Sequence, residues 1–105
     1  GGVVQGIGAA LYEECLYSPE GQLLNGNMAD YLVPMSGEMP DIVCAHVETP
    51  TLQSQLGAKG VGEAGTAGAP GAVMNAINDA LAPLNARVTA MPFTPERILK
   101  ALAKV

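Results

Sequence analysis

Charged residues are scarce in this 105-residue sequence: they make up 14% of it, whereas globular domains average about 25%. Basic residues are the rarer sign, with five Lys and Arg against ten Asp and Glu, for a formal net charge of −5. Nucleic-acid binding needs clustered Lys and Arg to neutralise phosphates, so the composition argues against nucleic acid as a partner. So few charges on a small domain indicate that protein or a cofactor covers part of its surface.

Long apolar runs and clusters of metal ligands are also missing. No stretch approaches the roughly 18 apolar residues of a membrane helix, so we expect no membrane association. Gly1–Gln5 lack the basic start of a signal peptide. Cys15 and Cys44 lie too far apart for a metal-site spacing, and we expect two buried, reduced thiols in a cytoplasmic protein. The single histidine, His46, cannot build a ligand set or a catalytic triad, and we expect it to be partly covered.

The spacing of apolar residues predicts three helices. The first covers residues 2–16, although glycines at positions 2, 6 and 8 each oppose a helix by about 1 kcal/mol. These glycines indicate that something packs closely against the first turns. The second helix is expected to have Thr66 as its cap and to stop before Pro83. The third begins with Thr94 as its cap and Pro95 at the first helical position.

Two segments are predicted to be strands. Asp41–Glu48 alternates apolar and polar side chains, and residues 87–91 are a second candidate. Residues 22–31 read as an extended segment with a short hairpin around Asn25-Gly26. The expected fold class is therefore α+β: one small two-layer unit over residues 1–105, with helices packed on a short, mainly antiparallel sheet.

A long loop, residues 49–65, ends in the glycine-rich sequence Gly57-Ala58-Lys59-Gly60-Val61-Gly62-Glu63-Ala64-Gly65. Its Gly60-x-Gly62-x-x-Gly65 string matches the dinucleotide fingerprint, but no strand directly precedes it and the expected acid is missing, which disfavours that fold. The glycines allow sharp turns and close approach of another group. Glu63, a carboxylate in that setting, is a candidate catalytic base; the alternative is an ordinary flexible connection.

Three motif segments occur in a fixed order along the chain. Together they resemble the C-terminal end of the molybdenum-cofactor-binding (large) subunit of the xanthine dehydrogenase, aldehyde oxidase and carbon monoxide dehydrogenase family. The segments are Gly1-Gly2-Val3-Val4-Gln5-Gly6-Ile7-Gly8-Ala9-Ala10-Leu11-x-Glu13-Glu14; Tyr17-Ser18-Pro19-Glu20-Gly21 with Asp30-Tyr31-x-x-Pro34 and Pro40; and Gly57-x-Lys59-Gly60-Val61-Gly62-Glu63 with Ala72-x-x-Asn75-Ala76-x-x-Asp79-Ala80 and Pro92-x-Thr94-Pro95-Glu96-Arg97.

The resemblance implies an oxidoreductase that hydroxylates a carbon of an aldehyde or N-heterocycle with oxygen from water, or that oxidises carbon monoxide. It assigns Glu63 as the general base and Gln5 as a hydrogen-bonding partner of the cofactor. Gly6, Gly60 and Gly62 would let the backbone approach the cofactor closely. No residue of this chain is expected to ligate the metal itself.

The resemblance also implies cofactors and partners. The cofactor would be molybdenum–molybdopterin, in its cytosine dinucleotide form, with electrons passing to 2Fe-2S and FAD groups elsewhere in the complex. The partners would be the remainder of the molybdenum subunit, the iron–sulfur and flavin subunits or domains, and a small-molecule substrate. Since family members are much longer, we expect a fragment that is inactive alone and able to self-associate. The alternative is a non-catalytic protein-interaction module with an apolar docking surface.

Overall fold

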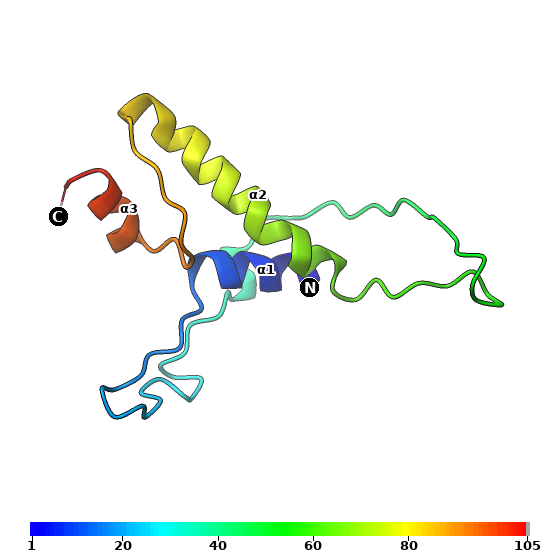
Figure 1. The fold of residues 1–105 in the computed structure, drawn as a ribbon, viewed down its shortest axis with the longest axis horizontal. Coiled ribbons are helices and arrows are strands. Elements are labelled where there is room, and N and C mark those ends of the chain that lie inside the picture. Colours follow the sequence, from blue (N-terminus) through cyan, green and yellow to red (C-terminus); the bar gives the residue numbers. More distant parts are fainter. Residues whose placement is uncertain (105) are drawn as a thin grey trace.

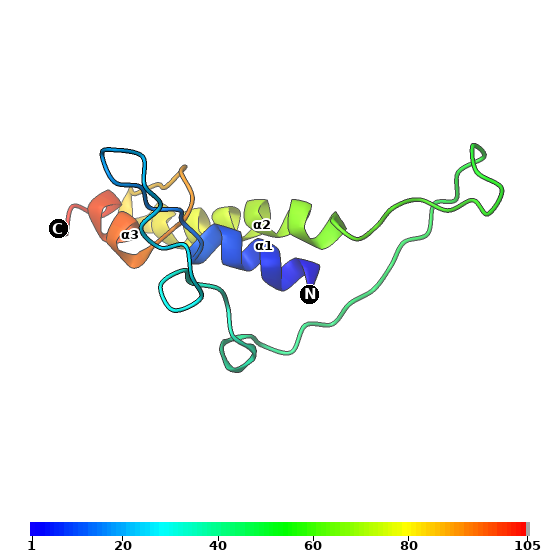
Figure 2. The ribbon, with the colours of Figure 1, turned by 90° about the horizontal axis from the view of Figure 1, so that it is seen from below.

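The computed structural model describes residues 1–104 and consists of helices joined by long irregular segments (Figure 1). Helices α1 and α2 pack side by side, and α3 lies near the C-terminal end of α2 (Figure 2). Two irregular excursions leave this helical body, one after α1 and one between η1 and α2. The elements are α1 (Gly2–Leu11), the 3₁₀-helix η1 (Ser36–Glu38), α2 (Ala64–Leu81), the 3₁₀-helix η2 (Ala82–Leu84) and α3 (Pro95–Ala101).

The chain is more open than a globular domain of its length. Its radius of gyration is 17.5 Å, against about 13 Å for a compact domain of about 100 residues. Its accessible surface is 8027 Å², whereas a folded monomer of 10.7 kDa exposes about 5,500 Å². The buried apolar core is correspondingly small and lies between the helices: Ala10, Leu81, Val88 and Phe93.

Glycines allow α1 and α2 to approach closely. A Cβ built on Gly6 would lie 2.7 Å from the Cβ of Ala69, and one built on Gly65 would lie 2.7 Å from the backbone nitrogen of Val3. Both distances are too short for real side chains, so each helix contributes one glycine that the contact requires. The close packing expected from the glycines of the first helix is therefore confirmed.

The first helix ends at Leu11, earlier than the predicted residue 16. The side chain of Asn25, which is 8% exposed, binds the backbone beyond that end. Its Nδ2 donates to the Glu14 carbonyl at 2.7 Å, and its Oδ1 accepts from the Leu16 N–H at 2.9 Å. These backbone groups thereby gain partners outside a helix, which accounts for the early stop. The expected hairpin at Asn25-Gly26 is therefore wrong.

The other two helices follow the prediction closely. The second begins at Ala64 with Glu63 at its N-cap, three residues before the predicted cap, and it stops before Pro83 as expected. Thr66 does not cap it; its hydroxyl donates instead to the Gly2 carbonyl at 3.0 Å. The third helix has the predicted Thr94 cap, whose Oγ1 accepts from the Arg97 N–H at 3.3 Å.

The predicted sheet is wrong for the residues described, because 1–104 contain no strand and only one isolated antiparallel bridge, between Tyr17 and Leu23. Residues 41–48 are extended but exposed and unpaired. Near the second predicted strand, the side chain of Asn78 takes the place of a neighbouring strand: it donates to the Val88 carbonyl and accepts from the Val88 N–H, both at 2.8 Å. An amide side chain thus satisfies backbone groups that a ladder would otherwise pair.

Burial of the cysteines and the histidine was also predicted wrongly. Cys15 and Cys44 are free thiols and both are exposed. His46 is exposed as well, like every other residue of the segment 41–48. Within the same described residues, no helix has the length and apolar character needed to cross a bilayer.

Candidate cofactor-binding site

The N-terminal ends of α1 and α2 meet at one place. A Cβ built on Gly2 would lie 3.4 Å from the Gly62 carbonyl oxygen and 3.5 Å from the Thr66 nitrogen. The hydroxyl of Thr66, 64 residues along the chain, donates to the Gly2 carbonyl at 3.0 Å. The first sequence motif and the glycine loop are therefore brought together, as Figure 1 shows at the end marked N.

Glu63 stands at this junction as the N-cap residue of α2, with φ −97° and ψ 0°. Its carbonyl accepts the first helical hydrogen bond, from the Ala67 N–H at 2.9 Å. Its side chain is exposed, and within residues 1–104 it forms no ion pair and accepts no hydrogen bond. The carboxylate is thus accessible to a ligand rather than used in packing.

The glycines before Glu63 leave space around the loop. A Cβ built on Gly60 or Gly62 would meet nothing within 4 Å. Gly57 has φ +66°, in the left-handed region that favours glycine, and it sets the turn that leads into the loop. Of the other residues predicted to contact the cofactor, Gln5 is exposed on α1, whereas Gly6 is buried against α2. The close contact at Gly6 is with α2, a partner that the sequence pattern did not identify.

Unpaired backbone donors gather at the same junction. The N–H groups of Val3 and Val4 in α1, and of Gly65 and Thr66 in α2, donate to no acceptor in the part of the chain that is described. Such groups at helix N-termini bind anionic oxygens, and the helix dipoles favour negative charge there. The N–H groups of Val3 and Thr66 face the opposite helix, because Cβ atoms built on Gly65 and Gly2 would lie 2.7 and 3.5 Å from their nitrogens. The exposed, neutral amide of Gln5 and the open loop are the groups that fit hydrogen bonding to a pterin cofactor.

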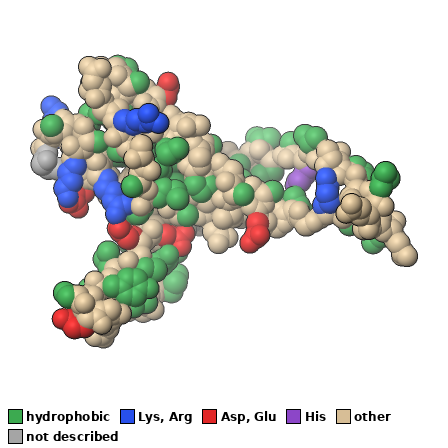
Figure 3. Space-filling view, viewed as in Figure 1, with side chains coloured by type: hydrophobic (Ala, Val, Ile, Leu, Met, Phe, Trp, Pro, Cys, Tyr) green, Lys and Arg blue, Asp and Glu red, His purple; other side chains and the backbone are tan. Residues whose placement is uncertain are grey.

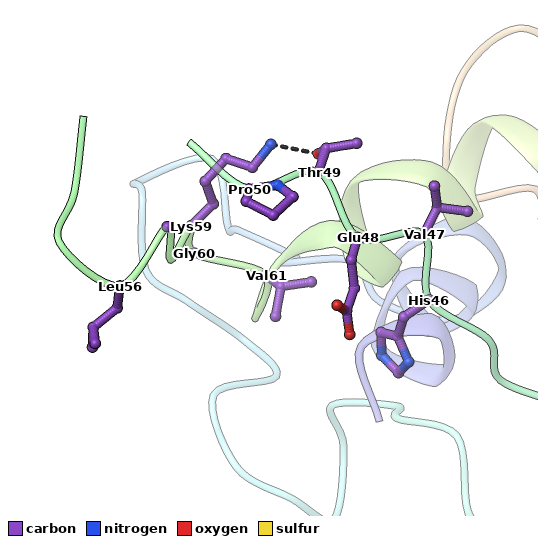
Figure 4. Close-up of a pocket in the computed structure, with 10 residues that line it drawn as sticks. His46, Val47, Glu48, Thr49, Pro50, Leu56, Lys59, Gly60 and Val61 are labelled. Atoms are coloured by element: carbon purple, nitrogen blue, oxygen red, sulfur yellow. Dashed lines mark hydrogen bonds between the residues drawn. The ribbon is translucent and has the colours of Figure 1, made fainter. Parts of the chain in front are cut away.

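A groove of about 520 Å³ lies next to the glycine loop. Figure 4 shows that His46 and Glu48 point to the same side, whereas Val47 points away from them. Across the groove, Lys59 Nζ donates to the Thr49 hydroxyl at 2.5 Å. Glu63 is not among the lining residues, so the groove ends short of the predicted base. The lining residues are His46, Val47, Glu48, Thr49, Pro50, Leu56, Gly57, Lys59, Gly60 and Val61.

Charge is distributed unevenly around the site. Four of the five basic residues follow residue 86, and on the face in Figure 3 most blue side chains lie over the end of the molecule that carries α3. Lys59 is the one basic residue within the glycine loop. Residues 1–104 contain no group of three or more His, Cys, Asp and Glu side chains that could hold a metal ion.

Several polar side chains tie distant segments of the chain together beyond the C-terminal end of α1. Tyr31 donates to the Glu13 carboxylate at 2.9 Å, and this hydrogen bond raises the pKa of the tyrosine. Arg97 donates to Glu14 at 2.5 Å and to the Pro92 carbonyl at 2.9 Å, which ties the segment around α3 to the end of α1. These partners are far apart in the sequence, so no local pattern could have paired them.

Comparison with known proteins identifies the family. Residues 1–40 match the family described as the molybdopterin cofactor-binding domain. The chain is 43% identical to the nicotine 6-hydroxylase large subunit of Paenarthrobacter nicotinovorans over 101 residues, 96% of this chain and 12% of that protein. It is 34% identical to the carbon monoxide dehydrogenase large chain of Afipia carboxidovorans, over 95% of this chain and 12% of that protein.

Solved structures give the same result. The crystal structure of quinoline 2-oxidoreductase from Pseudomonas putida 86 superposes with a TM-score of 0.90 and 43% identity, over 99% of this chain and 13% of that one. The Cu,Mo-containing carbon monoxide dehydrogenase superposes with a TM-score of 0.85 and 33% identity, over 99% of this chain and 14% of that one. The chain thus spans about one eighth of the relatives it matches. It belongs to the molybdenum-cofactor-binding large subunits of the xanthine dehydrogenase, aldehyde oxidase and carbon monoxide dehydrogenase family.

Proposed function

We propose that this chain is the C-terminal segment of the molybdopterin-binding domain of a molybdenum hydroxylase, and that Glu63 is the general base of the reaction. The observation that carries the proposal is the exposed Glu63 carboxylate, unpaired within residues 1–104, at the junction of the two helix N-termini. A general base needs a side chain that can come within hydrogen-bond reach of the proton it removes.

The residues around Glu63 would hold the cofactor. The amide of Gln5 can donate and accept hydrogen bonds, and the backbone at Gly60 and Gly62 offers an approach without side chains. When bound, the molybdenum cofactor supplies the redox chemistry that accepts two electrons from the substrate carbon. Glu63 would accept the proton of the water-derived oxygen as that oxygen attacks the carbon. Gly6 contributes by allowing α1 to lie against α2, which fixes the position of Gln5 relative to the glycine loop.

We further propose an N-heteroaromatic ring carbon as the substrate. The nicotine hydroxylase and the quinoline oxidoreductase, both named for such rings, are 43% identical to this chain, whereas the carbon monoxide dehydrogenases are 31% to 34% identical. The cytosine dinucleotide form of the pterin, 2Fe-2S and FAD groups on partner subunits, and a cytoplasmic location complete the proposal. The 105 residues alone are expected to hold no molybdenum and to show no turnover.

The role of Glu63 is tested by Glu63→Gln in the full-length large subunit. The variant should keep its molybdenum content and lose turnover by about 10²- to 10⁴-fold, the usual contribution of general-base catalysis. Asp79→Asn, an exposed acid on the same helix, is the matched control and should retain turnover. Near-normal turnover of Glu63→Gln would refute the proposal.

A protein-interaction role is the second candidate, and the exposed apolar side chains of residues 41–62 favour it. The two roles are compatible, because one chain can dock through this segment and carry a base at its end. A Glu63→Gln enzyme with full turnover would leave the interaction role alone standing.

A further inference from the structure

Residues 41–62 form an arm that leaves the helical body after η1 and returns to Glu63 at the start of α2 (Figures 1 and 2). Large apolar side chains on the arm are open to solvent: Val43 is 96% exposed, Val47 92% and Leu56 91%. Exposed apolar side chains gathered in one segment mark a surface that another protein surface covers. The arm is therefore an incomplete structure in need of a partner.

The outgoing limb, Asp41–Glu48, has the form of a strand without a neighbour. Within the described chain, none of its backbone N–H groups donates a hydrogen bond. Its side chains alternate: Val43 and Val47 lie on one face, and His46 and Glu48 on the other, as the close-up of Figure 4 shows for residues 46–48. Backbone donors and a period of two together indicate pairing with another strand.

The comparisons favour one occupant. The quinoline oxidoreductase superposes over 99% of this chain, arm included, yet the match covers only 13% of that chain. The open arm is thus the conformation found inside a much longer polypeptide. The rest of such a polypeptide is tethered to the arm, so its effective concentration far exceeds that of a second copy.

We propose that Asp41–Glu48 adds as a strand to a sheet edge in the remainder of the same large subunit, with Val43 and Val47 entering the apolar core of that region. The opposite face, with His46 and Glu48, then lines the groove that leads to Gly60. Docking of the arm would fix both of its limbs, and the returning limb ends at Glu63. The inference rests on the part of the proposed function that makes this chain a segment of a large subunit, and it holds whether or not Glu63 is the base.

The test is hydrogen–deuterium exchange of the full-length subunit within its enzyme complex. The amides of residues 42–48 should exchange at least about 100-fold more slowly than in an unstructured peptide of the same sequence. Unprotected amides would overturn the inference. Protection that disappears when the complex is diluted would assign the arm to a second copy and would also overturn it.

A variant pair tests the face assignment. Val43→Asp places a charge on the docking face and should reduce the protection of residues 42–48 by at least about tenfold. Cys44→Ser, one residue along on the opposite face, should leave protection unchanged. Equal effects of both variants would refute the assignment. If Val43→Asp prevents the subunit from accumulating, the amide exchange of residues 42–48 in the wild-type protein still tests whether the arm is docked. Glu63→Gln should not alter this protection, so the two proposals fail separately.

Discussion

Gly6 of α1 lies so close to Ala69 of α2 that a Cβ built on the glycine would be 2.7 Å from the Cβ of the alanine. This contact holds together the two motif segments that carry Gln5 and Glu63. The glycine that looked unfavourable for a helix is therefore required by packing between helices. Glycine is a poor helix former, but at this position it allows the N-terminal ends of α1 and α2 to meet.

Replacing Gly6 by Val should destabilise the large subunit by about 1–3 kcal/mol, because the added methyl groups force α1 away from α2. Thermal unfolding of the full-length subunit measures the change, and molybdenum content should fall with it. Gly68→Ala is the matched control: its Cβ would meet nothing within 4 Å, and Ala should stabilise the helix by about 0.5–1 kcal/mol. A Gly6→Val protein as stable as the wild type would show that the helices do not pack this way.

Asn78→Ala should be strongly destabilising. The change removes both hydrogen bonds to Val88, which is only 7% exposed, and leaves two backbone groups unpaired. Each such group costs about 1–3 kcal/mol. Denaturant unfolding should show this loss of unfolding free energy. The unfolding free energy of Asn75→Ala, an exposed change on the same helix, should stay within about 0.5 kcal/mol of the wild-type value. Equal midpoints for the two variants would contradict the role of Asn78.

The Tyr31–Glu13 hydrogen bond predicts a dependence of stability on alkaline pH. The pKa of Tyr31 is raised above its usual value of 10.0, first because its hydroxyl donates to Glu13. This bond therefore contributes fully to the free energy of unfolding below pH 10, and its contribution is lost as the pH rises through the raised pKa. The stability difference between wild type and Tyr31→Phe should shrink above pH 10, as followed by thermal unfolding. A difference that stays constant to higher pH would contradict this.

The helices could be predicted from sequence because their signals are local. Thr94 and Pro95 mark a helix start through their own chemistry, and the structure has them in those positions. The end of the first helix could not be predicted, because it depends on the side chain of Asn25, which lies beyond the predicted helix. A side chain that binds backbone groups many residues away in the sequence leaves no periodic pattern by which it could be recognised.

The strand predictions were wrong for a related reason. The alternation in Asp41–Glu48 describes a side-chain pattern, but a strand also needs a neighbour, and none exists in residues 1–104. The same absence explains why Cys44 and His46 are exposed despite their apolar surroundings in sequence. For the site, the sequence indicated Glu63 and the glycine loop, but not their junction with the first turn of α1, which only the fold creates.

The most direct test of the central claim is kcat/KM of the full-length enzyme and of its Glu63→Gln variant, measured at matched molybdenum content. In Glu63→Gln, kcat/KM should be about 10²- to 10⁴-fold lower, because an amide cannot accept the proton that a general base removes. A variant that keeps its molybdenum and turns over at the wild-type rate would show that Glu63 is not the base.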